Sequence, residues 1–460
     1  MEFKNAWTTY SEADMTALEG VAARYRDYLS KGKTERECVT VAIELAEKHG
    51  YVDMKKLIAE GGKVVPGDRL YMDCMGKSLM LFIVGQESLV KGFNILGAHI
   101  DSPRIDVKQN PLYEDGDLVY LDTHYYGGIK KYQWVTLPLA LHGVVVKKDG
   151  SIVNICVGED ENDPVFSISD LLIHLSRDQM GKKASEVITG EQLDLIVGSI
   201  PLTEDEKTSA KANVLKILTD MYGIEEEDFL SAELEIVPAG KAREMGFDRS
   251  LIMGYGHDDR VCAYAQLEAM FDIEGIPAKT CACILADKEE IGSVGATGMR
   301  AKYFENAIAE LMNLAVEYSE LNMRRGLAAC KMLSCDVSAG YDPAFAAAFE
   351  KKNTAVLGHG VCFNKFTGSG GKSGSNDANP EFIAQLRKIM EDGGVNYQTA
   401  ELGKVDVGGG GTIAYICALY GMDVIDSGVA VLNMHAPWEI ISKADLFEAV
   451  KGYKQFVLNA

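Results

Sequence analysis

Short apolar runs alternate with longer amphipathic segments over much of the chain. Runs rich in β-branched and small residues, such as those at 93–97 and 280–286, are typical of buried strands, and apolar residues three and four positions apart are typical of helices. Predicted helices cover 11–30, 34–49, 259–271, 304–321, 382–391, 411–420 and 443–456, and predicted strands cover 70–72, 79–84, 93–97, 280–286, 332–335 and 424–432. This alternation predicts a three-layer α/β/α domain.

The segment from residue 105 to residue 238 has a different pattern. Alternating stretches at 118–121, 139–146 and 152–157 predict strands, helical patterns follow at 168–175 and 203–221, and a strand is predicted at 233–237. We therefore predict that 105–238 is a β-rich segment distinct from the flanking parts at 1–104 and 239–460.

Composition and charge narrow the class of protein. The chain has 460 residues, of which 47% are hydrophobic and 25% charged, as in ordinary globular proteins. Its net charge of -22 argues against nucleic acid and anionic membranes as partners. Apolar stretches are too short to span a bilayer, the start lacks the features of a signal peptide, and the ten cysteines form no paired framework. We expect a reduced, cytoplasmic protein.

A pair of glutamates, Glu289 and Glu290, follows the predicted strand 280–286 at the start of a glycine-containing loop. Sites in open α/β sheets lie at the carboxyl ends of strands. In a loop, unlike in a strand, two adjacent side chains can serve one pocket, so one carboxylate could bind a metal while its neighbour carries a proton. The alternative is a solvated pair of surface glutamates, which is the commoner situation for such a pair.

Four other strand ends or helix starts carry potential metal ligands. His99 and Asp101 close the strand 93–97, and their spacing lets the carboxylate orient the imidazole. Asp258 stands at a predicted helix start, where an N-terminal capping role is the alternative. Asp336 and His435 follow two further strands, where a turn aspartate and a satisfied histidine are the alternatives.

The order of these residues along the chain is more specific than any one of them. Histidine, aspartate, a glutamate pair, aspartate and histidine each occur at a strand end or helix start. Such a mixed nitrogen and oxygen shell suits a pair of zinc, manganese or cobalt ions better than a thiolate site would. A dinuclear metal centre with a bridging carboxylate is the predicted arrangement.

Together these motifs resemble the aspartyl aminopeptidase family, cytosolic aminopeptidases with two metal ions and large tetrahedral assemblies. The resemblance covers nearly the whole chain and rests on Gly97–Pro103, the His-Asp-Asp of 257–259, Asp287–Ser293, the Cys335-Asp336 segment and Met434-His435. It implies a metallopeptidase fold, two divalent ions per subunit, most simply zinc, and peptide substrates. It also implies His99, Asp258, Glu290, Asp336 and His435 as metal ligands with Asp258 as the bridge, Glu289 as the general base and Asp101 as the orienter of His99.

The resemblance also implies that residues 105–238 form a β-rich inserted domain, with the first part of the catalytic domain at 1–104 and the second at 239–460. In the family this segment is a dimerisation domain within a homododecamer, and a histidine reaches from it into the active site of a partner. His174 is the residue here that resembles this histidine. A core histidine on an apolar helical face is the alternative.

Substrate preference is the point at which the sequence departs from the family. The acidic preference of the family depends on a lysine in a motif that this chain replaces with a longer, glycine-rich stretch at 360–372. Lys365 is the first candidate to pair with an acidic substrate side chain and Lys372 the second, with solvated lysines as the alternative. The stretch at 134–138 also departs from the pattern, and the glycine-rich turn 408–412 matches it only loosely.

Two other functions are compatible with the same residues. A related dinuclear deacylase would use the same metals on a different amide. A non-catalytic assembly protein would retain only the fold, but it would have no physical need for five metal ligands and Glu289 together. The residues therefore favour a metal-dependent aminopeptidase.

Overall fold

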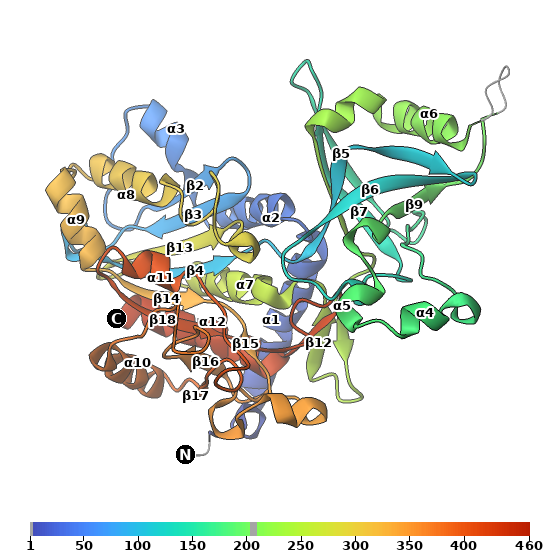
Figure 1. Cartoon of the computed structure of the whole chain (residues 1–460). Coiled ribbons are helices and arrows are strands. Elements are labelled where there is room, and N and C mark those ends of the chain that lie inside the picture. The colour runs from blue at the N-terminus through green and yellow to red at the C-terminus, as the bar shows by residue number, and fades with distance from the viewer. Residues whose placement is uncertain (1–2, 203–208) are drawn as a thin grey trace. The chain divides into compact units, whose positions relative to one another are not determined.

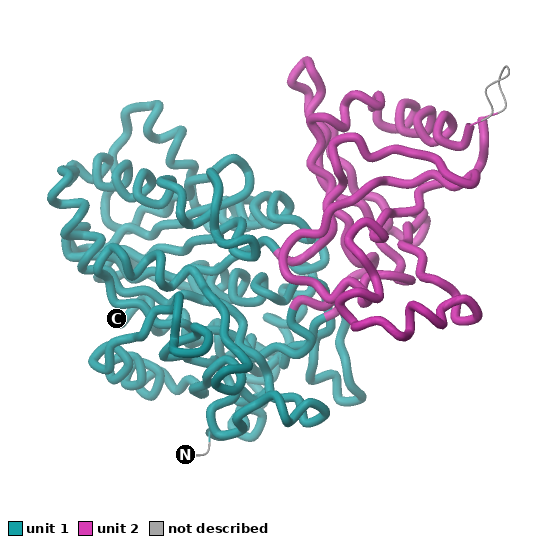
Figure 2. The backbone as a smooth tube through the Cα atoms, viewed as in Figure 1, with its two compact units in different colours: residues 1–101, 242–434, 439–460 teal, residues 102–241, 435–438 magenta. Residues whose placement is uncertain are grey.

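The computed structural model describes residues 3–202 and 209–460 and divides the chain into two compact units (Figures 1 and 2). Unit 1 comprises Met1–Asp101, Ala242–Met434 and Glu439–Ala460, and unit 2 comprises Ser102–Lys241 and His435–Trp438. The boundaries predicted from the sequence lie after residues 104 and 238, three residues from those of the structure, and the prediction places 435–438 in the catalytic domain rather than in unit 2. The dimerisation role of the inserted segment stays a prediction.

Unit 1 is organised around a nine-stranded sheet (Figure 1). Its strands, in spatial order, are β1 (Val52–Asp53), β2 (Arg69–Cys74), β3 (Ser78–Ile83), β13 (Thr280–Ala286), β4 (Phe93–His99), β14 (Lys331–Cys335), β18 (Asp423–Gly428), β16 (Val361–Asn364) and β17 (Tyr397–Thr399). The four strands from β13 to β18 are mutually parallel, so their carboxyl ends lie at one edge of the sheet.

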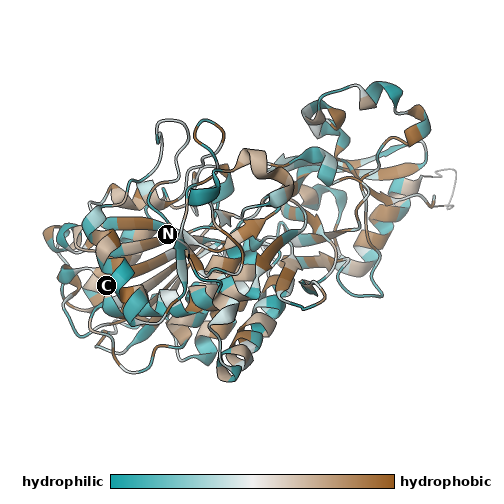
Figure 3. Ribbon diagram, turned by 90° about the horizontal axis from the view of Figure 1, so that it is seen from below, coloured by the Kyte–Doolittle hydropathy of each residue, from teal (hydrophilic) through white to brown (hydrophobic). Residues whose placement is uncertain are grey.

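Helices cover both faces of this sheet, as the alternation of buried residues along its strands requires. Leu81 of β3 packs into one hydrophobic cluster and the adjacent Phe82 into another. Figure 3 shows apolar residues along the strands. The first cluster includes residues of α1 (Glu12–Lys31), α2 (Glu35–Lys48), α7 (His257–Phe271), α10 (Pro380–Asp392) and α12 (Lys443–Asn459), and the second includes residues of α3 (Met54–Ala59), α8 (Tyr303–Leu314), α9 (Glu320–Ala328) and α11 (Ala414–Ala418). The predicted three-layer α/β/α architecture is confirmed.

A second, five-stranded sheet in unit 1 consists of β11 (Arg243–Met245), β12 (Leu251–Gly254), β20 (Glu439–Ser442), β19 (Ala430–Leu432) and β15 (Ser338–Ala339). The strand predicted at 424–432 is therefore divided at Val429 between the two sheets. The helix predicted at 304–321 is also divided, because Val316 has a left-handed φ of 60° and Ser319 caps a new helix. The helix predicted at 411–420 is shorter, over 414–418.

Unit 2 contains a six-stranded antiparallel sheet in the order β8 (Ile152–Val157), β7 (Leu139–Val146), β10 (Ala232–Pro238), β5 (Arg104–Asp115), β6 (Leu118–Tyr126) and β9 (Leu195–Gly198). Its helices are α4 (Arg177–Met180), α5 (Ala184–Val187) and α6 (Ala210–Tyr222). The prediction of a helix at 168–175 is wrong, since only a short 3-10 turn forms at Ile173–Leu175. The predicted helix 203–221 begins in residues 203–208, which lie outside the described part of the chain.

Within residues 3–202 and 209–460, the structure has no helix with both the length and the apolar character needed to cross a bilayer.

Candidate metal centre and active site

Three neighbouring parallel strands bring the first group of site residues to one edge of the nine-stranded sheet. β4 ends at His99, which faces Ala286 at the end of β13, and on its other side β4 pairs with β14, which ends at Cys335. His99, the turn after β13 and Asp336 therefore follow adjacent strands at the same edge. This juxtaposition is the one expected for a site at the carboxyl ends of parallel strands.

The imidazole of His99 lies between carboxylates from three parts of the chain. Its Nε2 is 3.2 Å from Asp258 Oδ1 and 3.8 Å from Asp336 Oδ1. Its Nδ1 is 2.9 Å from the backbone oxygen of Asp101 and 3.4 Å from Asp101 Oδ1. Because the backbone oxygen only accepts, Nδ1 carries a proton, and Nε2 points at the two other carboxylates.

Asp258 stands in the irregular first turn of α7. Its φ and ψ of -79° and 108° are not helical, and the peptide bond to Asp259 is cis. The backbone N–H of Asp258 donates to Glu439 Oε2 at 3.0 Å. Asp258 and Asp259 are both buried, whereas an acidic residue that only caps a helix is usually solvated. A capping role alone does not account for this position.

The residue before Asp258 is fixed by a buried chain of hydrogen bonds. His257 Nε2 lies 3.2 Å from the carbonyl oxygen of Ile252, and His257 Nδ1 lies 2.6 Å from the hydroxyl of Tyr25. The carbonyl can only accept, so Nε2 donates to it and Tyr25 donates to Nδ1. Burial lowers the pKa of His257 to about 3, against a smaller upward effect of the Ile252 carbonyl, so the imidazole is neutral.

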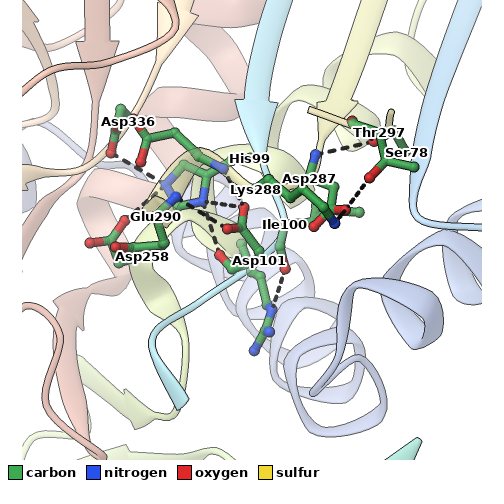
Figure 4. A network of polar contacts seen from close by, with 12 residues as sticks. Ser78, His99, Ile100, Asp101, Asp258, Asp287, Lys288, Glu290, Thr297 and Asp336 are labelled. Carbon is green, nitrogen blue, oxygen red and sulfur yellow. Dashed lines mark hydrogen bonds and ion pairs between the residues drawn. The ribbon is translucent and has the colours of Figure 1, made fainter. Parts of the chain in front are cut away.

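The glutamate pair forms a short 3-10 turn over Glu289–Ile291, flanked by left-handed Lys288 (φ 66°) and Gly292 (φ 90°). Asp101 holds this turn, since its Oδ1 accepts from Glu289 N–H at 3.1 Å and its Oδ2 accepts from Glu290 N–H at 3.2 Å. Figure 4 shows Glu290 on the same side as His99, Asp258 and Asp336. Asp101 thus contacts His99 and both residues of the glutamate pair.

Burial raises the pKa of Glu289 to about 8. His99 acts in the opposite direction, and Asp336, Asp101 and Asp258 raise the pKa further through their negative charges. A carboxyl group with a pKa in this range can exchange a proton near neutral pH.

A second network fixes the start of the turn (Figure 4). Asp287 is fully buried and its carboxylate accepts from Lys288 Nζ at 2.6 Å and from Thr297 Oγ1 at 2.5 Å. Its backbone N–H donates to Ser78 Oγ, and that hydroxyl donates to the carbonyl oxygen of Thr297. The loop from 287 to 297 is therefore closed onto β3, which leaves the glutamate pair projecting from a rigid base.

The donor atoms around His99 fit a divalent metal. One ligand atom each from His99, Asp258 and Asp336 lies within 4.8 Å of the others, which is a spacing that a single ion can bridge. Burial lowers the pKa of His99, but its hydrogen bonds with Asp101, Asp258 and Asp336 outweigh burial and raise it overall. The surrounding carboxylates therefore favour a positive charge near Nε2 of His99. Imidazole together with carboxylates is a donor set that binds zinc.

The fifth predicted ligand, His435, opens the segment 435–438 that groups with unit 2. Its Nδ1 lies 2.8 Å from the carbonyl oxygen of Gly128, so Nδ1 carries the proton and Nε2 has the lone pair. His174 is exposed within its 3-10 turn, between Ile173 and Leu175, which are 70% and 66% exposed. An exposed imidazole excludes the alternative of a core histidine.

The two candidate lysines share one carboxylate. Lys365 Nζ lies 3.1 Å from Asp377 Oδ1, and Lys372 Nζ lies 3.2 Å from Asp377 Oδ2. Lys372 also lies 3.9 Å from the centre of the Phe366 ring. Both lysines and Asp377 are partly exposed, and the hydrogen bond from Lys365 keeps the pKa of Asp377 below its usual value.

Several residues that hold the site had no recognisable sequence signal. Tyr25 and Glu439 contact the Asp258 turn from α1 and β20. Arg260 is fully buried and donates to the carbonyl oxygens of Ile100 and Lys33 at 3.1 and 2.8 Å, which fixes the end of β4 against α7. A sheet-edge cluster of one imidazole and several carboxylates that fits a divalent metal is the kind of site that metal-dependent hydrolases use.

Comparison with known proteins identifies the family. The chain matches the family described as "Aminopeptidase I zinc metalloprotease (M18)" over residues 28–457. It is 60% identical to a probable M18 family aminopeptidase 1 of Clostridium acetobutylicum, over 100% of this chain and 98% of that protein. The crystal structure of an M18 aminopeptidase from Thermotoga maritima, 44% identical, superposes with a TM-score of 0.95 over 100% of both chains. That of aminopeptidase I from C. acetobutylicum, 57% identical, gives 0.93 over 100% of both.

The chain therefore belongs to the M18 family of zinc metalloproteases and is a metal-dependent aminopeptidase. This confirms the predicted enzyme class, and zinc is the metal of the family.

Proposed function

We propose that this aminopeptidase holds two divalent ions with His99, Asp258, Glu290, Asp336 and His435, with Asp258 as the bridge, and that Glu289 is its general base. The observation that carries the proposal is the clasp of the Glu289–Glu290 turn by Asp101, which also contacts His99. Asp101 thereby holds the turn of the proposed proton acceptor through its carboxylate and accepts from His99 Nδ1 through its backbone oxygen, with the carboxylate 3.4 Å from the same nitrogen.

Bound divalent ions would lower the pKa of a water molecule and polarise the peptide carbonyl. Glu289 takes the proton from the attacking water and returns it to the nitrogen of the departing amine. The pKa of Glu289 is about 8 in the ion-free site. Bound cations would lower it, because their positive charge offsets the repulsion from the neighbouring carboxylates. Asp101 does not exchange protons with the substrate, because its oxygens are used by the two backbone N–H groups and His99.

We further propose that the enzyme prefers acidic amino-terminal residues, bound through Lys365 first and Lys372 second. Asp377 neutralises much of the charge of both lysines, so an acidic substrate side chain must compete with it. The geometry therefore supports a modest acidic preference rather than a strict one.

Self-association through unit 2 is proposed to complete the active sites, with His174 reaching the site of a partner in a homododecamer. Support comes from the exposed apolar residues around it: Leu171, Leu172, Ile173 and Leu175 are 46%, 54%, 70% and 66% exposed. A run of this kind marks an interaction surface. A solved structure with the same fold, 21% identical, is described as "Structure of S. cerevesiae mApe1 dodecamer". We also propose a cytoplasmic location.

The test is hydrolysis of a panel of aminoacyl anilides and short peptides by zinc-loaded and by chelator-treated enzyme. We expect zinc-dependent release of amino-terminal residues, with Asp and Glu substrates favoured. Zinc-dependent release of neutral residues only would retain the mechanism and refute the acidic preference. Cleavage of acylated amino acids without cleavage of peptides would favour a deacylase, and zinc content near zero would favour an assembly protein.

A further inference from the structure

Two parallel strands of unit 1 pass together from the nine-stranded sheet into the five-stranded sheet. β14 and β18 pair in the first sheet, and their continuations β15 and β19 pair in the second. The register is the same before and after the transfer, since Cys335 faces Ser427 and Ser338 faces Ala430. Asp336 lies opposite Gly428 at the point of transfer.

Backbone hydrogen bonds join the two strands throughout this passage. Asp336 N–H donates to the oxygen of Ser427 at 2.8 Å, Ser338 N–H to Val429 at 2.9 Å, and Gly340 N–H to Val431 at 2.8 Å. The ladder is therefore continuous although the sheets are separate. Its first bond beyond β14 is the one that fixes the backbone of Asp336.

Gly428 allows the strands to approach closely at this point. A Cβ added to Gly428 would lie 1.7 Å from the carbonyl oxygen of Asp336 and 2.6 Å from its carbonyl carbon. Carbon and oxygen atoms ordinarily approach to about 3.3 Å. Any side chain at 428 would therefore force the two strands apart by more than an ångström.

The pairing of β14 with β4 ends at Ser334, before Asp336, so at the point of transfer β18 is the less movable of the two strands. On its other edge it pairs with β16, where Cys362 faces Gly428. Two residues before Gly428, buried Asp426 accepts a hydrogen bond from Thr412 Oγ1 at 2.5 Å. Displacement would consequently fall on Asp336, which continues into a strand of only two residues.

We propose that the end of β18, through the missing side chain of Gly428 and the carbonyl of Ser427, positions Asp336 for metal binding. Gly428 and Ser427 are positioning residues in this proposal, which rests on the proposed role of Asp336 as a ligand. Metal ligands must be held to within about 0.5 Å, so a shift of this size removes Asp336 from the zinc shell.

The experiment measures zinc content and zinc affinity of Gly428→Ala in the full chain. Loss of a residue that orients a ligand typically lowers metal affinity by about 10- to 100-fold, and we expect the zinc affinity of Gly428→Ala to fall in this range. Added zinc should also raise the melting temperature of this variant less than that of the wild type. Gly85→Ala is the matched control. Its Cβ would lie 2.3 Å from the backbone of Lys279, in the same sheet but at the opposite end of β13. It should destabilise the fold and leave zinc affinity unchanged.

Asp336→Ala separates the ligand role proposed for Asp336 from the positioning role proposed for Gly428. Unchanged zinc affinity in this variant would refute the ligand role of Asp336, whereas zinc loss in Asp336→Ala with normal affinity in Gly428→Ala would refute the positioning role of Gly428. Equal zinc loss in Gly85→Ala and Gly428→Ala would also refute it.

A milder pair of variants covers the case in which Gly428→Ala does not fold. Thr412→Val removes the hydrogen bond that anchors Asp426, whereas Thr412→Ser retains a hydroxyl group. We expect zinc affinity about threefold to tenfold lower for Thr412→Val, which is below the full loss of an orienting contact, and close to wild type for Thr412→Ser. Equal affinities in these two variants would contradict the proposal.

Discussion

Asp101 accepts a hydrogen bond from the backbone N–H of Glu289 at 3.1 Å, although the two residues lie 188 positions apart in the chain. The other oxygen of the carboxylate accepts from Glu290 N–H at 3.2 Å. The orienting role predicted for Asp101 therefore extends to the turn that carries Glu289, the proposed general base. Both halves of the proposed site contact this one residue.

Replacement of Asp101 should affect the two halves together. Asp101→Ala leaves the backbone N–H groups of Glu289 and Glu290 without their acceptor and removes the carboxylate that lies 3.4 Å from His99 Nδ1. We expect kcat to fall by about 100-fold with a loss of zinc affinity of about 10-fold. Asp101→Asn retains one acceptor oxygen and should be intermediate. Steady-state kinetics with metal analysis would measure both. A variant that lost zinc but kept its turnover per zinc would contradict the dual role.

Glu289→Gln should separate proton transfer from metal binding. The amide has nearly the same shape as the carboxylate but accepts no proton at neutral pH, so kcat should fall by about 10²- to 10⁴-fold. Zinc content should stay near that of the wild type, because Glu289 is not among the proposed ligands. Glu290→Gln is the matched comparison and should lose zinc. Full activity of Glu289→Gln would remove the general-base assignment.

Local sequence patterns sufficed for the strands that carry the site. The strand predicted at 280–286 coincides with β13, and the glutamates after it are in a turn because Gly292 and the left-handed Lys288 end the extended chain. The helix predicted at 168–175 failed because its apolar residues after Ile168 are exposed, so their spacing does not reflect a buried face.

Contacts that depend on distant backbone could not be predicted. The Asp101 clasp uses backbone N–H groups, which every non-proline residue has, and therefore leaves no mark in residue type. The same holds for the Ser427 carbonyl that holds Asp336. Tyr25 and His257 form a side-chain pair, but α1 and α7 had to be placed side by side before it could be seen.

Two inactive variants should restore activity to each other if His174 acts in a partner subunit. His174→Ala retains an intact metal site, and Glu289→Gln retains His174. Co-expressed chains with different tags would place the wild-type His174 of one beside the wild-type Glu289 of the other. We expect each homo-oligomer to have low activity and the doubly purified mixture to regain a substantial fraction, about a quarter for random pairing of subunits, because only complete sites turn over.

The control for this experiment is a mixture of His174→Ala with the double variant His174→Ala/Glu289→Gln, which contains no wild-type His174 and should stay inactive. Normal kinetics of His174→Ala alone would show that this exposed imidazole is not needed. Zinc content should be unchanged throughout.

Removal of Asp377 should increase the preference for acidic substrates. The carboxylate holds Lys365 and Lys372 at 3.1 and 3.2 Å, and its loss frees their charge for a substrate side chain. Exposed ion pairs are worth about 1 kcal/mol at most, so Asp377→Ala should raise the ratio of kcat/KM for Asp over Leu substrates by about fivefold or less. Lys365→Ala should lower the same ratio. An unchanged ratio in both variants would place the specificity residues elsewhere.

Asp445 should make the stability of the protein depend on pH. It is fully buried on α12, where burial raises its pKa from 3.8 to about 8 despite hydrogen bonds from Gly358 N–H at 2.8 Å and Gly360 N–H at 2.7 Å. The folded state therefore binds the proton more tightly than the unfolded state does. The resulting stabilisation is complete below the unfolded pKa and is lost as the pH rises through the folded value.

Asp445→Asn cannot ionise and should reduce the fall in melting temperature between about pH 5 and about pH 8 by about 2 to 4 °C. Asp392→Asn, which removes an exposed charge, serves as control, and an equal fall in wild type and Asp445→Asn would show that Asp445 does not titrate in this range.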